Sequence, residues 1–164
     1  MTKRKTGKSR RSQPKSGVLS PLVRSAFEVL EHGLFHYLRS TTPKDMKFAL
    51  LHIDQAIELM LKERVRSGGR SIHKPNNPKE TISIWQAYDI LEKELKCTIP
   101  ERPNLELLHE ERNNIQHKYS NPSADDAAFH VEHAMKFVER FVRDELKLNL
   151  ADFVPSEFLT KVLP

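Results

Sequence analysis

Residues 44–66 read KDMKFALLHIDQAIELMLKERVR, and this stretch sets the expectation for the whole fold. Its apolar residues recur at steps of three and four, which is the period of a buried stripe on an α-helix. The stripe contains Met46, Ala49, Leu50, Ile53, Ala56, Ile57, Met60 and Leu61, and Phe48, Leu51, Leu59 and Val65 lie outside it. A helix that is apolar on several sides packs on more than one partner, so this segment is predicted to be the central helix of its domain.

Outward from this segment, the same period predicts four more helices, separated by segments rich in proline, glycine and asparagine. They are expected at about 20–39, 80–95, 104–118 and 123–148, with Ser20, Asn104 and Ser123 as N-caps. Residues 67–79 and 96–103 are predicted to be loops. Because 164 residues suit one domain and strand-favouring runs are scarce, the chain is predicted to be an all-α bundle of four to five helices.

Charge divides the chain into a basic N-terminal segment and a near-neutral remainder. Of the 27 basic residues, seven lie in residues 1–17, which hold no acid, so residues 18–164 carry 20 basic and 22 acidic residues. Residues 1–17 are predicted to be a disordered tail, because they cannot bury enough apolar surface to fold. The tail either makes loose phosphate contacts through counterion release or is only a solubilising or linker end.

The helical domain is then expected to span residues 18–148, and residues 149–164 to be an extension that docks on the bundle or on a partner. No stretch of eighteen apolar residues is present, so no membrane-spanning helix is expected. The N-terminus lacks the apolar core and the cleavage site of a secretion signal. A single cysteine, Cys97, cannot form an internal disulfide, which fits a reducing cytoplasm.

The predicted helix 104–118 carries a basic residue inside its apolar arc. At 100° per residue, Leu105, Leu108, Ile115 and Tyr119 gather on one side, and Arg112 falls among them. A buried charge without a partner is strongly destabilising. Arg112 therefore either pairs with an acid of the central helix, Asp54 or Glu58, or is held at a groove to bind phosphate in a bidentate manner.

His117 follows Arg112 by five residues, and Asn113, four residues before His117, shares its face. Arg112 and His117 lie about 140° apart around an ideal helix, so they converge only if the long arginine reaches across and the helix end frays. A histidine at a helix end also commonly caps free carbonyls, and the spacing by itself favours that role.

The run Arg112-Asn113-Asn114-Ile115-Gln116-His117-Lys118-Tyr119 nevertheless resembles the Arg-x4-His-x-Tyr signature of HEPN domains, the higher eukaryote and prokaryote nucleotide-binding family. It lies near the end of a late helix and just before a long final helix, as in that family. Residues 48–62, FALLHIDQAIELMLK, are similar to the family's central helix, which often carries an acid. The resemblance covers about 44–148.

The resemblance implies a metal-independent endoribonuclease that needs no cofactor and leaves a 2′,3′-cyclic phosphate and a 5′-hydroxyl. It implies a homodimer in which the two motifs form one composite site across a cleft. His117 would be the general acid or base, Arg112 would stabilise the charge of the phosphorane, and Asn113 would orient the histidine or the phosphate. The acid of the central helix matches Asp54 or Glu58.

Three neighbouring residues complete the expected site. Lys118 and Asn114 are expected to contact RNA. Tyr119 matches a tyrosine that is modified, in some toxin pairs, by a partner nucleotidyltransferase antitoxin. The resemblance therefore favours a toxin or defence effector.

Two other functions stay open. Many HEPN domains are catalytically silent modules that bind nucleotide, RNA or a protein partner, and the near-neutral folded part shows no evident basic groove. A purely structural helical dimer is the third possibility. A dimer is also expected on packing grounds, because the all-round apolar central helix and the apolar C-terminal segment exceed what a five-helix monomer covers.

The remaining candidate residues are interpreted as structural. His32 and His36 have the spacing of metal ligands, but no third ligand is evident, so they are expected to be surface histidines, as are His130 and His133. Glu58 and Lys62 are expected to form an ordinary i,i+4 ion pair. Trp85 and Tyr88 are expected to anchor the core rather than to stack on bases.

Overall fold

The computed structural model describes residues 18–40 and 42–163, and the predicted basic tail, residues 1–17, lies outside this range. The described part is mostly helical, which confirms the all-α prediction. Its elements are α1 (Pro21–Leu38), α2 (Pro43–Ser67), β1 (His73–Lys74), β2 (Asn77–Thr81), α3 (Ile84–Asp89), a π-helical turn (Ile90–Glu94), α4 (Arg102–His117), α5 (Ala124–Asp144), a 3₁₀ turn (Leu150–Asp152) and α6 (Ser156–Val162).

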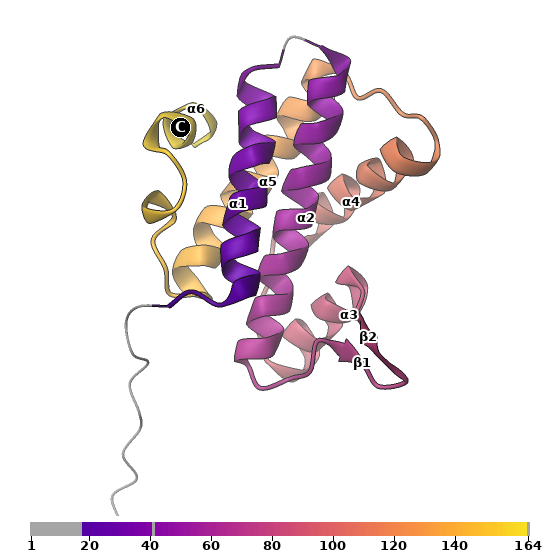
Figure 1. Ribbon diagram of the computed structural model, residues 1–164, viewed down its shortest axis with the longest axis vertical. Helices are drawn as coiled ribbons and strands as arrows, with labels where there is room; N and C mark the ends of the chain where they lie inside the picture. Colours follow the sequence, from indigo (N-terminus) through magenta and orange to yellow (C-terminus); the bar gives the residue numbers. More distant parts are fainter. Residues whose placement is uncertain (1–17, 41, 164) are drawn as a thin grey trace, which may run out of the picture.

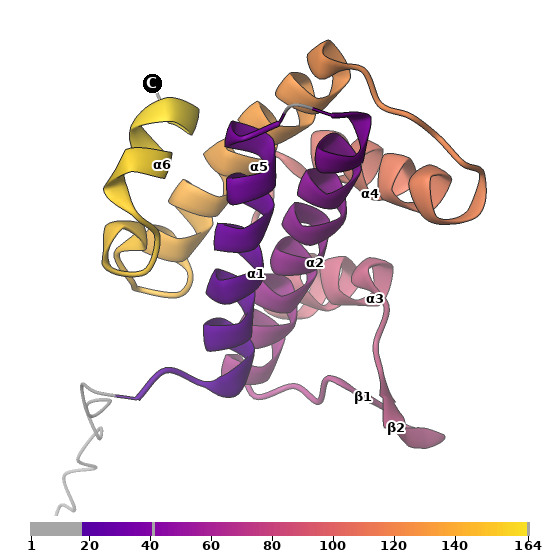
Figure 2. The same ribbon diagram turned by 45° about the horizontal axis from the view of Figure 1, so that its top comes forward.

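Helix α2 is the centre of the fold, as its apolar pattern predicts. It lies side by side with α1 and contacts α3, α4 and α5 on its other sides (Figures 1 and 2). Ile53 and Ile57 of the predicted stripe are buried, and so is Val65, which lies outside that stripe. A helix covered on several sides buries apolar residues all round, which is why the pattern of α2 departs from a single face.

The helix ends follow local sequence signals in α1 and α5. Ser20 caps α1 by accepting a hydrogen bond from the backbone N–H of Val23 at 3.2 Å. Ser123 caps α5 and forms a capping box with Asp126. The prediction of Asn104 as the N-cap of α4 is wrong, because α4 begins at Arg102. Its first turn accommodates Pro103, where a missing N–H breaks no helical hydrogen bond.

Residues 67–79, predicted to be a loop, contain most of a β-hairpin, and the segment predicted as one helix from 80 to 95 begins with the end of its second strand. Strands β1 and β2 pair antiparallel, with His73 opposite Thr81. The helix α3 starts only after Ser83, whose side chain caps it in a capping box with Gln86. Thr81 and Ile82 are β-branched and favour extended backbone, which explains the later start.

The C-terminal residues 149–163 lie against the chain's own bundle. Helix α6 contacts α1 and α5, and Phe153 stacks on Phe27 with ring centroids 4.5 Å apart. Much of this segment and of α2 packs within one chain, but Phe48, Leu51 and Phe158 are only half-buried, so a dimer formed through this surface stays a prediction. None of the helices in residues 18–40 and 42–163 combines the length and the apolar character of a membrane span.

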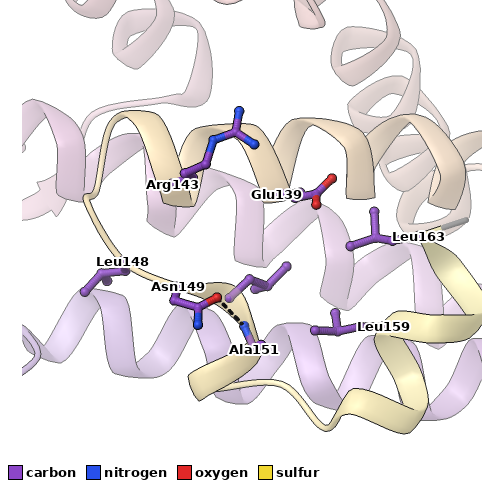
Figure 3. A pocket seen from close by; sticks show the side chains of 8 residues that line it. Glu139, Arg143, Leu148, Asn149, Ala151, Leu159 and Leu163 are labelled. Carbon is purple, nitrogen blue, oxygen red and sulfur yellow. Dashed lines mark hydrogen bonds between the residues drawn. The ribbon is translucent and has the colours of Figure 1, made fainter.

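Figure 3 shows a pocket between α5 and this C-terminal segment. Its lining consists of Glu139, Arg143, Leu148, Asn149, Leu150, Ala151, Leu159 and Leu163. None of the site residues predicted from the sequence lines this pocket.

Candidate functional site on helix α4

The predicted motif occupies the last turns of α4 and the residues that follow. This end of α4 projects beside the α1–α2 pair, and residues 118–123 loop back to α5 (Figures 1 and 2). Leu105, Leu108 and Ile115 are buried, as predicted for the apolar arc. Tyr119 is not part of that arc: it is 89% exposed and has φ of 58°, because α4 ends at His117.

Arg112 lies at the edge of the buried arc and is held from two directions. Its Nε lies 3.7 Å from Oδ2 of Asp54 on α2, and its Nη1 donates a hydrogen bond to Oδ1 of Asn113 at 2.9 Å. The Asp54 side chain is 2% exposed, whereas that of Arg112 is 29% exposed. The partner of Arg112 is therefore Asp54 rather than Glu58, and the guanidinium remains partly open to solvent.

Glu58, the other acid considered from the sequence, is engaged elsewhere. Its Oε1 lies 2.5 Å from Nζ of Lys62, which confirms the predicted i,i+4 ion pair. Lys62 also donates a hydrogen bond to the hydroxyl of Thr81 at 2.8 Å, so the pair ties α2 to the end of β2. This arrangement assigns Glu58 a structural role.

His109 is a member of the site that the sequence analysis missed. Its Nδ1 lies 3.0 and 3.3 Å from the two carboxylate oxygens of Asp54. The hydrogen bond to Asp54 raises the pKa of His109 above its usual value, although burial and the Arg112 charge act in the opposite direction. One buried carboxylate thus binds two side chains of α4, His109 and Arg112, that lie three residues apart on one face. In the sequence, His109 follows Leu105 by four residues and so lies beside the apolar arc of Leu105 and Leu108. That position was the signal that could have indicated a buried partner for it.

The aromatic residues of α3 divide between core and surface. Tyr88 is 1% exposed, which confirms the core prediction, and the guanidinium of Arg102 lies 4.7 Å above its ring. Burial is the main cause that raises the pKa of Tyr88. Trp85 is 40% exposed, so the core prediction is wrong for it. Its ring meets His109 edge-on at 5.7 Å, which places an aromatic surface beside the Asp54 cluster.

The C-terminal half of the motif is open to solvent. His117 and Lys118 are exposed, and the side chain of His117 makes no hydrogen bond or ion pair among the described residues. The carbonyl of Asn114 accepts hydrogen bonds from the backbone N–H groups of Lys118 and Ser120, at 2.8 and 3.3 Å. The structure therefore joins Arg112 to both Asp54 and Asn113, but within the described part of one chain it does not join His117 to them.

A separate cluster, made of three histidines, lies on the side of α2 that faces α1, away from Asp54. His32 and His36 of α1 meet His52 of α2, and one ligand nitrogen from each lies within 4.8 Å of the others. The sequence showed no third ligand for the His32–His36 pair, because His52 follows 16 residues later on another helix. His130 and His133 are half-buried on α5 and join no such group in the described range.

Comparisons of the chain with models of protein families, with curated proteins and with solved structures find no match. Relatives therefore assign no role to any residue of the site. What the residues can do follows from their geometry, which combines an oriented, partly exposed guanidinium with an exposed histidine at the end of the same helix.

Proposed function

We propose that this protein is a metal-independent endoribonuclease of HEPN type, which cuts RNA to a 2′,3′-cyclic phosphate and a 5′-hydroxyl. The observation that carries the proposal is the guanidinium of Arg112, partly exposed on α4 and oriented from beneath by the buried carboxylate of Asp54. Arginine has five N–H donors, and its contacts with Asp54 and Asn113 use only some of them. Donors therefore remain for a phosphate oxygen.

His117 supplies the proton transfer in this proposal. It removes the proton of the 2′-hydroxyl, whose oxygen attacks phosphorus, while the departing 5′-oxygen takes up a proton from water. Arg112 offsets the negative charge that accumulates on the non-bridging oxygens. The RNA provides its own nucleophile, so the step requires neither a metal nor a cofactor.

Two copies of the chain are part of the proposal. Arg112 and His117 of one helix lie about 140° apart, so a single chain does not readily aim both at one phosphate. A homodimer that brings two α4 ends together supplies an arginine from one copy and a histidine from the other. Exposed apolar residues of α3 and α4, Trp85 and Leu107, are available for such a contact.

The proposed biological role is that of a cytoplasmic toxin or defence effector. The Tyr119 side chain is 89% exposed, so its hydroxyl is accessible to a nucleotidyltransferase-like antitoxin. Lys118 and Asn114, next to it, are proposed RNA contacts. Of these, Lys118 is exposed and Asn114 is half-buried.

The test is cleavage of a single-stranded RNA by the purified full chain in excess EDTA. Wild type should cut, and His117→Ala and Arg112→Lys should each lose roughly 10²–10⁴-fold in rate. His133→Ala, which removes a half-buried histidine outside the site, is the matched control and should cut like wild type. A wild type that cuts no RNA, or cuts only with added metal, contradicts the proposal.

A second candidate function is a catalytically silent HEPN module that binds nucleotide, RNA or a protein partner. It is favoured by the existing partners of Arg112, because Asp54 and Asn113 already satisfy part of its charge and donors. The near balance of 20 basic and 22 acidic residues in 18–164 points the same way. RNA that is bound and left intact by the wild type would support this module.

A further inference from the structure

We propose that His32, His36 and His52 form a binding site for a divalent transition-metal ion, with Zn²⁺ as the physiological occupant. One nitrogen of each histidine lies within 4.8 Å of the other two. Around a zinc ion with bonds of about 2.0–2.1 Å, ligand nitrogens lie about 3.3 Å apart. To bind the ion, the ligand nitrogens therefore have to move closer together by about 1.5 Å, which rotation of the histidine side chains can supply.

The packing of α1 against α2 places these three histidines next to one another. His32 and His36 lie one turn apart on the same face of α1, and their ring centroids are 4.7 Å apart. The ring of His52, from α2, lies 4.6 Å from that of His32. Gly33 lies between His32 and His36 in the sequence. It permits the close approach of α1 and α2, because a Cβ at this position would lie 2.9 Å from Cγ1 of Ile53.

A carboxylate orients one of the three ligands. Oδ1 of Asp45 lies 3.2 Å from Nδ1 of His36, and the hydroxyl of Thr42 donates a hydrogen bond to Oδ2 of Asp45 at 2.8 Å. An imidazole whose Nδ1–H is bound by a carboxylate presents Nε2 as the metal ligand. Asp45 is thus a positioning residue for the proposed site.

His52 is in a suitable state to bind a cation. Its Nδ1 is buried and has no hydrogen bond of ordinary geometry among the described residues. A metal ion bound at this nitrogen would give it a partner.

The donor set indicates the class of ion. Three imidazoles suit Zn²⁺, Cu²⁺ or Ni²⁺, whereas Mg²⁺ and Ca²⁺ require oxygen ligands. His52 and Asp54 are two residues apart, about 200° around α2, so the metal lies away from Asp54 and Arg112. The ion therefore links α1 to α2 and takes no part in the proposed RNA cleavage, which continues in EDTA.

Zinc binding by the full chain, stripped of metal, is measured by calorimetry and by the visible spectrum of added Co²⁺. Wild type should bind one Zn²⁺ per chain and melt at a higher temperature with it. His32→Ala should weaken Zn²⁺ binding at least tenfold. Because His32 is exposed, the circular dichroism spectrum of this variant should match that of the wild type. Asp45→Asn should weaken binding roughly 10–100-fold.

His133→Ala is the matched control and should bind Zn²⁺ as the wild type does. The proposal is overturned if the wild type binds no Zn²⁺ at micromolar concentration. It is equally overturned if folded His32→Ala binds Zn²⁺ with unchanged affinity, because the ion would then lie at other histidines. Since RNA cleavage is not the readout, neither result depends on the proposed nuclease activity.

Discussion

Asp54 contributes both to the stability of the fold and to the proposed chemistry of the α4 site. Its side chain is 2% exposed, and it receives Nδ1 of His109 at 3.0 Å and Nε of Arg112 at 3.7 Å. A buried carboxylate is tolerated only with such partners. Asp54 therefore fixes α4 on α2, and the same contact orients the arginine that the proposed function requires.

Removal of His109 is expected to destabilise the fold. In His109→Ala, Asp54 keeps only the longer contact with Arg112, so the free energy of unfolding should fall by about 2–4 kcal/mol. Denaturant unfolding measures this loss, and His73→Ala, an exposed histidine on β1, should change stability by less than about 0.5 kcal/mol.

The contribution of His109 should also depend on pH. Because Asp54 raises its pKa in the folded state, the stabilisation is fully present below the unfolded pKa of about 6.5. It declines as pH rises through the raised folded value. The difference in unfolding free energy between wild type and His109→Gln should therefore shrink between pH 6 and pH 9. A difference that grows with pH would contradict the role given to Asp54.

At the scale of elements, the contact between α1 and α2 depends on a residue without a side chain. A Cβ at Gly33 would lie 2.9 Å from Cγ1 of Ile53, 3.1 Å from Cβ of His52 and 3.2 Å from the carbonyl oxygen of Ala49. Backbone and Cβ atoms cannot rotate away, so the helices would have to separate.

Gly33→Ala is expected to destabilise the protein by about 1–2 kcal/mol. The substitution gains about 1 kcal/mol in helix propensity but overpacks the interface by about 2–3 kcal/mol. Denaturant unfolding checks this value, with Arg24→Ala, an exposed position on α1, as the control. An unchanged or more stable Gly33→Ala would show that α1 and α2 have room to spare at this point.

The elements also show how far the sequence predicts the fold. The long helices α1, α2 and α5 follow from apolar period and capping residues, since both signals are local. The helical period extends over Thr81 and Ile82 and so predicts too early a start for α3, whereas Ser83 and Gln86 form the capping box that begins the helix. The hairpin lies mostly within the predicted loop 67–79, and because every residue of β2 is exposed, it has no alternating apolar pattern.

The site was predictable only in part, for a physical reason. Arg112 is notable in the sequence because a charge in an apolar arc needs a partner, and the structure supplies Asp54 from the two acids considered. His109 and His52 were missed because their partners lie 55 residues away and on a neighbouring helix, respectively. Contacts between helices depend on how the helices cross, which the period of one helix does not specify.

For the whole molecule, a dimer is expected because the proposed site needs groups from two copies of α4. The apolar residues of α2 and of residues 149–163 pack largely, though not completely, within one chain. Leu107, in the first half of α4, is 46% exposed, and Tyr119, just beyond its C-terminal end, is 89% exposed, so both are available for a contact. The full chain is therefore expected to sediment as two copies at micromolar concentration, and a mass of one chain would remove the basis of a composite site.

Mixing two inactive variants tests the composite site directly. His117→Ala keeps Arg112, and Arg112→Ala keeps His117, so each homodimer lacks one group at both positions. If a site takes its arginine from one copy and its histidine from the other, half of the randomly mixed dimers contain one intact site. Unfolding and refolding the variants together should then restore up to about a quarter of the wild-type rate. No recovery, from variants that dimerise normally, would place both groups of each site within a single chain.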